Sequence, residues 1–190
     1  MTVVAERRPF TADEFLVWEA QQALRHEYLA GDVFAMTGGT LDHNRLAGNL
    51  FAALRAGLRG TPCEVFINDV MVRVEAADAC FYPDLVVTCS EADRHAERVI
   101  SQARVIVEVL SPSTAAHDWG AKFEAYSHLP GLAEYVLVEA ERIAVHVLRP
   151  NAAQRWERWH CGPGDSLELT SLGLDIPLAE LYAGTAPAGG

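Results

Sequence analysis

Residues 104–110 read Arg-Val-Ile-Val-Glu-Val-Leu, and residues 82–87 read Tyr-Pro-Asp-Leu-Val-Val. Both stretches are nearly continuous in hydrophobicity, a pattern typical of strands that are buried on both faces of a sheet. Each stretch contains one carboxylate, Glu108 in the first and Asp84 in the second. The two stretches therefore predict neighbouring central strands of a sheet with an acidic side chain inside each.

Helical and extended patterns alternate on either side of these two strands. Leucines recur at every fourth position from 46 to 58, which predicts an amphipathic helix over 42–58. Thr11 and Glu14 have the spacing of a capping box, which predicts a first helix over 11–24. A tight hairpin is expected at Ala30-Gly31-Asp32. Further strands are expected at 64–67, 70–75, 135–138, 143–148 and 155–160, and a helix at about 118–128.

The whole pattern predicts one α/β (α+β) domain. The chain has 190 residues, half of them hydrophobic and 22% charged, which is globular composition. We expect residues 1–184 to form the domain and residues 185–190 to be a disordered tail. The segments 64–67 and 70–75 are expected to adjoin each other, with a bend at Asn68-Asp69 between them.

The N-terminus and the cysteines bear on the compartment. Residues 1–9 contain no apolar core of a signal peptide, and no apolar run approaches the ~20 residues that span a bilayer. The expected location is the cytoplasm, away from membranes. The four cysteines are widely spaced and include no CxxC pair, which argues against a zinc ribbon. In a cytoplasmic protein they are expected to be reduced core thiols.

The formal net charge of −11 is a difficulty for any nucleic-acid-binding function. Strong nonspecific DNA binding normally needs a basic face, and here only Arg45, Arg55 and Arg59 recur on one predicted helix. Either the basic surface is local, or metal ions supply much of the positive charge, or the protein does not bind nucleic acid well.

The two acidic residues in apolar strands are the first candidates for chemistry. A buried carboxylate is costly unless it is paired, hydrogen-bonded or bound to a metal. Two of them on neighbouring strands repel each other unless a cation lies between them, and oxygen ligands suit a hard cation such as Mg²⁺ or Mn²⁺. Asp84 and Glu108 are therefore candidate metal ligands. The alternative is that each is neutralised by its own arginine or caps a nearby helix.

Lys122 is the third candidate. It is the only lysine in the chain, and the other 14 basic residues are all arginine. Its spacing from Trp119, Phe123 and Tyr126 places it on the core side of the predicted helix. A compact ammonium can contact an attacking water or a phosphoryl oxygen in ways that a bulky guanidinium cannot. The alternative is a lysine that reaches past the core to solvent.

The order of these motifs resembles a known family, Uma2 (DUF820), which belongs to the PD-(D/E)XK nuclease superfamily. The resemblance covers roughly residues 10–181, and its N-terminal part includes residues 26–32 and His43. The motifs that carry its C-terminal part are Pro83-Asp84, residues 108–114, Asp118, Lys122, Tyr126, Gly131 and Glu134-Tyr135.

The resemblance implies a restriction-endonuclease-like core, with a central mixed sheet flanked by helices and preceded by an N-terminal helix and hairpin. It also implies that Asp84 and Glu108 hold Mg²⁺. The superfamily motif has a lysine two positions after the acidic residue, where this chain has Leu110. Lys122 then corresponds to a catalytic lysine that has moved to the following helix.

Glu27 and His43 are further candidates within this resemblance. Glu27 could add a carboxylate ligand or orient a water molecule, and His43 could act as a base or bind phosphate at a helix N-terminus. The alternatives are a strand-edge glutamate and a capping histidine. Asp118 is expected to favour a helix N-terminus, with a supporting role toward Lys122.

These residues predict a Mg²⁺-dependent (or Mn²⁺-dependent) endonuclease that hydrolyses phosphodiester bonds of nucleic acid, with DNA favoured over RNA. Asp84, Glu108 and the carbonyl of Val109 are expected to hold the metal, and Lys122 to act at the phosphate. One alternative is a non-catalytic binding or assembly module with the same fold. Another is hydrolysis of a different phosphate-containing substrate. Strand edges after Tyr135 and the aromatic residues at 155–160 suggest a homodimer.

Overall fold

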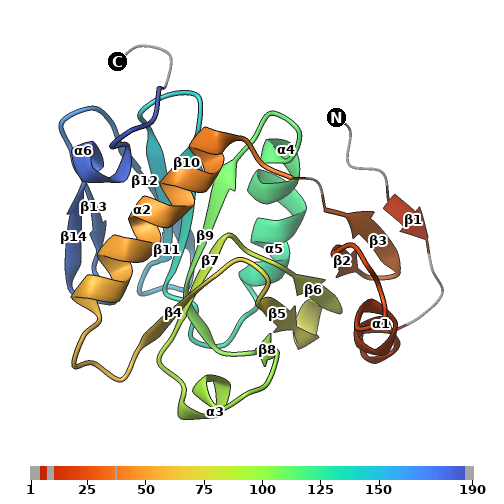
Figure 1. Ribbon diagram of the computed structural model, residues 1–190. Helices are drawn as coiled ribbons and strands as arrows, with labels where there is room; N and C mark the ends of the chain where they lie inside the picture. Colours follow the sequence, from red (N-terminus) through yellow and green to blue (C-terminus); the bar gives the residue numbers. More distant parts are fainter. Residues whose placement is uncertain (1–4, 8–10, 37, 187–190) are drawn as a thin grey trace.

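The computed structural model describes residues 5–7, 11–36 and 38–186. Within them, the strands form two six-stranded sheets and a separate two-stranded hairpin (Figure 1). Sheet A contains, in spatial order, β1 (Ala5–Arg7), β3 (Asp32–Ala35), β2 (His26–Leu29), β6 (Ala79–Phe81), β5 (Met71–Val74) and β8 (Val99–Ile100). Sheet B contains β12 (Trp156–Cys161), β11 (Val145–Pro150), β10 (Glu134–Glu139), β9 (Ala103–Leu110), β7 (Leu85–Thr88) and β4 (Glu64–Ile67). The hairpin consists of β13 (Ser166–Leu169) and β14 (Leu174–Pro177).

The helical segments are mostly short. They are α1 (Ala12–Glu19), α2 (Leu41–Gly57), the 3-10 turn η1 (Glu75–Ala77), α3 (Glu91–Arg94), α4 (Ala115–His117), the π-helical turn η2 (Asp118–Lys122), α5 (Phe123–Tyr126) and α6 (Leu178–Leu181).

Sheet B is the mixed central sheet that the sequence predicts. Strand β9 pairs with β10 in parallel and with β7 in antiparallel orientation, and both β7 and β9 are almost wholly buried. Helix α2 packs its leucine stripe against one face, and α5 covers the other face (Figure 1). The prediction of a mixed sheet flanked by helices is therefore confirmed.

The N-terminal helix and hairpin are also confirmed. Thr11 and Glu14 form both hydrogen bonds of a capping box at the start of α1, which ends at Glu19 and not at the predicted residue 24. Ala30 and Gly31 both have positive φ angles, as a two-residue turn between β2 and β3 requires.

The prediction that β4 and β5 adjoin each other is wrong. Strand β4 pairs with β7 in sheet B, whereas β5 pairs with β6 and β8 in sheet A. Asn68 and Asp69, between them, both have a φ of 49°, a left-handed conformation that these two residue types tolerate. The expected bend is therefore where the chain passes from one sheet to the other.

Two boundaries near the candidate residues also differ from the prediction. Asp84 lies one position before β7, which begins at Leu85, so this carboxylate is at the strand's entrance and not inside it. The helix expected at 118–128 begins earlier, at Ala115, and its middle is the π-helical turn η2, which contains Lys122. A hydrophobic stripe does not reveal a π-helical turn, because one wide turn changes the stripe very little.

The prediction of reduced cysteines is wrong for one pair. Cys63 and Cys89 form a disulfide next to the paired ends of β4 and β7, while Cys80 and Cys161 are free. None of the described helices is long and apolar enough to cross a membrane. In the predicted tail, Thr185 and Ala186 donate hydrogen bonds to Tyr182 and Asp42, and residues 187–190 lie outside the described part of the chain.

Candidate active site

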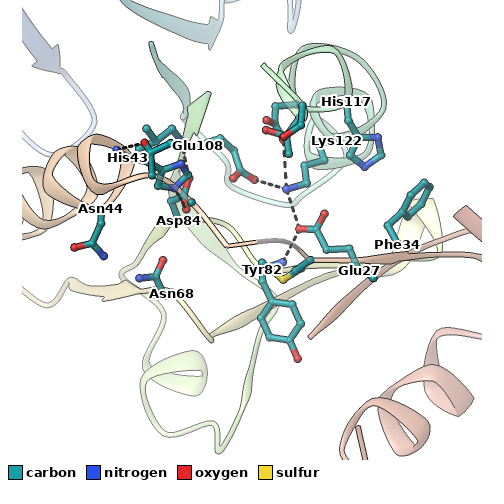
Figure 2. Close-up of a pocket in the computed structure, with 18 of the residues that line it drawn as sticks. Glu27, Phe34, His43, Asn44, Asn68, Tyr82, Asp84, Glu108, His117 and Lys122 are labelled. Atoms are coloured by element: carbon teal, nitrogen blue, oxygen red, sulfur yellow. Dashed lines mark hydrogen bonds and ion pairs between the residues drawn. The ribbon is translucent and has the colours of Figure 1, made fainter. Parts of the chain in front are cut away.

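A pocket of about 550 Å³ lies beside the end of β9. Residues of β2 and β3, the N-terminus of α2, the 68–69 bend and the α4–η2 segment line it (Figure 2). All the side chains predicted from sequence to form the site line this pocket, and Val109 does too: Glu27, His43, Asp84, Glu108, Lys122 and Val109.

The buried ammonium of Lys122 is at the centre of the polar contacts. Its Nζ lies 2.8 Å from Oε1 of Glu27, 3.1 Å from Oε1 of Glu108 and 3.4 Å from Oδ1 of Asp118. These four residues are each at most 6% exposed. They come from β2, β9 and η2, so the cluster holds three parts of the chain together (Figure 2).

Asp84 forms a second, adjoining group of contacts. Its Oδ1 lies 2.8 Å from Nε2 of His43, and its Oδ2 accepts a hydrogen bond of 2.7 Å from the backbone N–H of Val109. Thr40 caps α2 by accepting from the backbone N–H of His43, which fixes the imidazole at the helix N-terminus.

Sheet pairing explains why Asp84 and Glu108 meet. Strands β7 and β9 are antiparallel, with Leu85 opposite Val107, so the next position along each strand brings Asp84 beside Glu108. The backbone N–H of Val109 points toward Asp84. The backbone carbonyl of Val109 lies on the same side of β9, because the N–H and C=O groups of one strand residue face the same neighbouring strand.

The electrostatics of the pocket are dominated by burial and crowded negative charge. Burial raises the pKa of Glu108, and the neighbouring carboxylates raise it further. The positive charge of Lys122 lowers this pKa, but the net result lies well above 4.5. Burial alone lowers the pKa of Lys122, but the surrounding carboxylates outweigh it and raise the pKa well above 10.5. Lys122 is therefore charged at neutral pH.

The two histidines of the pocket have pKa values shifted in opposite directions. Burial lowers the pKa of His43, but its hydrogen bond to Asp84 and the nearby negative charges raise it, and the net result lies above 6.5. Burial lowers the pKa of His117 below 6.5. At neutral pH His117 is therefore the more weakly basic of the two.

Comparison with known proteins agrees with the motif order. The model of the Uma2 family, described as "Putative restriction endonuclease", matches residues 12–179. The chain belongs to the Uma2 family. Two relatives from Synechocystis sp. are described as the "uncharacterized" proteins slr1290 and sll1609. The first is 34% identical over 92% of both chains, and the second is 32% identical over 73% of this chain and 80% of its own.

A solved structure shares the Uma2 fold. It is described as "a putative nuclease belonging to DUF820" from Anabaena variabilis, and it superposes with a TM-score of 0.75. The match covers 92% of this chain and 98% of that one at 18% sequence identity, a level at which the likeness shows the fold.

The donor set of this Uma2 chain fits a divalent cation. The pocket brings the carboxylates of Glu27, Glu108 and Asp118 around one ammonium, with Asp84 in the same pocket. Apart from its 3.4 Å ion pair with Lys122, the buried Oδ1 of Asp118 has no hydrogen-bond partner in the described structure. Among the described residues, no three His, Cys, Asp or Glu side chains are grouped as a complete metal cage. Mg²⁺ commonly binds through one or two carboxylates and completes its shell with water or substrate oxygens, so the available donors suit it.

Some pocket residues were not predicted from the sequence. Phe34, Asn44, Asn68 and His117 line the pocket, and Tyr126 donates a hydrogen bond of 3.4 Å to Glu108. The sequence does place Tyr126 on the helical stripe of Lys122, but it gives no sign of the hydrogen bond to Glu108. The other four have no pattern of their own, because they reach the pocket from separate segments.

Proposed function

We propose that this protein is a Mg²⁺-dependent endonuclease that hydrolyses phosphodiester bonds of DNA in the pocket of Asp84, Glu108 and Lys122. The observation that carries the proposal is the surplus of negative charge there, because three buried carboxylates contact the single ammonium of Lys122 and a fourth, Asp84, lines the same pocket. A buried surplus of this kind is costly unless a cation offsets it.

Asp84 and Glu108, together with the carbonyl of Val109, would hold the cation. When bound, it supplies a Lewis acid that polarises a phosphoryl oxygen and makes water a better nucleophile at neutral pH. Asp84 is held for this role by His43 on one oxygen and by the N–H of Val109 on the other. His43 is thus a positioning residue for Asp84.

Lys122 would offset the charge that builds on the phosphate during attack. Its ammonium is held in place by Glu27, which itself accepts a hydrogen bond of 3.1 Å from the backbone N–H of Tyr82. Glu27 therefore positions Lys122. The family description and the Anabaena neighbour, which is described as "a putative nuclease", support phosphodiester hydrolysis as the reaction.

The test is cleavage of supercoiled plasmid by purified protein with Mg²⁺ or Mn²⁺. Asp84→Ala, Glu108→Ala and Lys122→Ala are each expected to lower the nicking rate by about 100-fold or more, since the first two remove ligands of the proposed cation and the third removes the ammonium that acts at the phosphate. Addition of EDTA is expected to stop the wild-type reaction.

Glu134→Gln is the matched control, because Glu134 is also a fully buried carboxylate of sheet B but bonds Arg149, Thr170 and Ser171 outside the pocket. It is expected to nick at the wild-type rate. Equal nicking by wild type and all three site variants contradicts the proposal. Absence of nicking together with absence of Mn²⁺ binding at Asp84 and Glu108 favours the alternative, a non-catalytic module with the nuclease fold.

A further inference from the structure

The charges around the pocket limit the kind of nucleic acid that can bind there. This inference rests on the proposed function. None of the described residues that line the pocket is an arginine, and its one lysine is surrounded by carboxylates. Duplexes are held largely through their phosphates by basic side chains. Other contacts must therefore supply most of the substrate binding here.

One side of the pocket offers an aromatic surface. Phe34 and His117 lie with their ring centroids 4.9 Å apart, on the opposite side of Lys122 from Asp84 (Figure 2). Phe34 is half-buried and belongs to none of the described core clusters, so packing of the core does not account for it. Met36, 40% exposed, extends the apolar lining. An aromatic ring at this place can stack on a nucleobase.

The Asp84 side of the pocket offers amides. Asn44 and Asn68 lie there on different segments, α2 and the 68–69 bend (Figure 2). Both are exposed, and neither side chain makes a hydrogen bond with the described part of the chain. Amide groups can hydrogen-bond the edges of bases, and in an unpaired strand all edges of a base are available.

A second pocket, of about 600 Å³, shares two lining residues with the first, Asp69 and Tyr82. Unlike the first pocket, the second has arginines in its lining, Arg25, Arg94 and Arg98, beside the carboxylates of Glu19, Asp69, Asp93 and Glu97. Arg25 and Arg98 each have a carboxylate 3.5 Å away, whereas Arg94 makes no ion pair or side-chain hydrogen bond with any residue that the structure describes.

We propose that the substrate binds as an unpaired strand that spans both pockets. One base stacks on Phe34, the amides of Asn44 and Asn68 contact a neighbouring nucleotide, and the backbone passes Tyr82 so that a phosphate meets Arg94. Stacking tolerates every base because each has a π-face, and it is not available in a duplex, where the faces are already stacked.

The test is fluorescence anisotropy with one labelled 12-nucleotide DNA, single-stranded or annealed to its complement, in Ca²⁺ and with the DNA recovered uncut. Wild type is expected to bind the single strand about tenfold or more tightly than the duplex. Phe34→Leu, which keeps apolar bulk but removes the ring, should weaken single-strand binding about tenfold. Phe34→Tyr, which keeps the ring, should stay within about twofold of wild type.

The second pocket has its own readout in the same assay. Arg94→Gln should lower the magnitude of the slope of log Kd against log salt by about 0.7, the loss of one phosphate contact on a single strand. Arg59→Gln is the control, because Arg59 lines neither pocket. A single-stranded RNA of the same sequence shows whether the strand's sugar matters.

Equal or tighter duplex binding, or an unchanged affinity in Phe34→Leu, overturns the inference. If Arg94→Gln leaves the slope of log Kd against log salt unchanged, the bound strand does not extend into the second pocket. Binding is measured without cleavage, so the two proposals fail separately. A protein that nicks plasmid but prefers duplex contradicts only this inference. One that prefers single strands but never cuts contradicts only the proposed function.

Discussion

At the scale of single residues, Lys122 determines the character of the site. One ammonium contacts three buried carboxylates from different parts of the chain. Removing one partner of a buried ionic network leaves charges uncompensated in a poorly polarisable surrounding, which is far more costly than breaking an exposed pair. Lys122 should therefore matter for stability as well as for the proposed reaction.

Lys122→Met is expected to lower the free energy of unfolding by about 3–5 kcal/mol in the absence of divalent ions. Urea denaturation in EDTA measures it. Adding Glu27→Gln to this variant should recover part of the loss, because one buried negative charge is then gone. Arg142→Met is the comparison, since Arg142 pairs with Glu139 at the surface and its loss should change stability little. A Lys122→Met protein as stable as wild type contradicts this account of the cluster.

The sequence revealed some of these residues and not others, for physical reasons. Asp84, Glu108 and Lys122 could be picked out because each is a charge in an apolar context. The contact between His43 and Asp84 could not be predicted, because it joins positions 41 residues apart and depends on how α2 meets β7. Arg94 and Phe34 gave no signal, since one arginine among 14 and one phenylalanine among seven are ordinary in a sequence.

At the scale of elements, the π-helical turn η2 (Asp118–Lys122) carries two residues of the candidate site. It lies between α4 and α5 and contains Asp118 and Lys122, both buried, so this irregular turn presents both site residues to the pocket. π-Helical turns are rare and occur frequently at functional sites. The strands and amphipathic helices could be predicted from hydrophobic period, but the π-helical turn and the change of sheet at residues 68–69 could not.

Gly120→Ala is expected to stabilise the protein by about 0.5–1 kcal/mol, because glycine inside a helix costs conformational entropy. A Cβ at Gly120 meets no atom within 4 Å. Gly57→Ala, at the end of α2, is the contrasting variant, because its Cβ would lie 2.6 Å from Leu174. Thermal unfolding compares the two. If Gly120→Ala unfolds more readily than wild type, the turn needs the freedom of glycine, and the prediction is wrong.

The disulfide between Cys63 and Cys89 predicts the reactivity of the thiols. In the unreduced native protein, iodoacetamide at pH 8 should label the half-buried Cys161, whose thiol pKa burial also raises, faster than Cys80. Cys80 is fully buried, and burial raises the pKa of its thiol to about 12. Peptide mass spectrometry should then find Cys63 and Cys89 labelled only after reduction. Rapid labelling of either one without reduction contradicts the pairing.

At the scale of the whole molecule, negative charge is the main constraint on function. A net charge of −11 repels polyanions, and the acidic pocket adds to that repulsion. In the proposed function, a divalent cation between Asp84 and Glu108 would offset the charge at the point where a phosphate has to enter. The aromatic and amide sides of the pocket offer contacts that need no net positive charge. The claim that the pocket holds a divalent metal therefore underlies both the proposed reaction and the proposed substrate.

The most direct test of this claim is a crystal soaked in Mn²⁺ and measured for anomalous scattering. We expect one strong peak between Asp84 and Glu108, about 2.1 Å from an oxygen of each and close to the carbonyl of Val109. The peak should be absent from crystals of Glu108→Gln and present in those of Glu134→Gln. A well-ordered wild-type crystal with no peak at this place, or with its only strong peak elsewhere, contradicts the account.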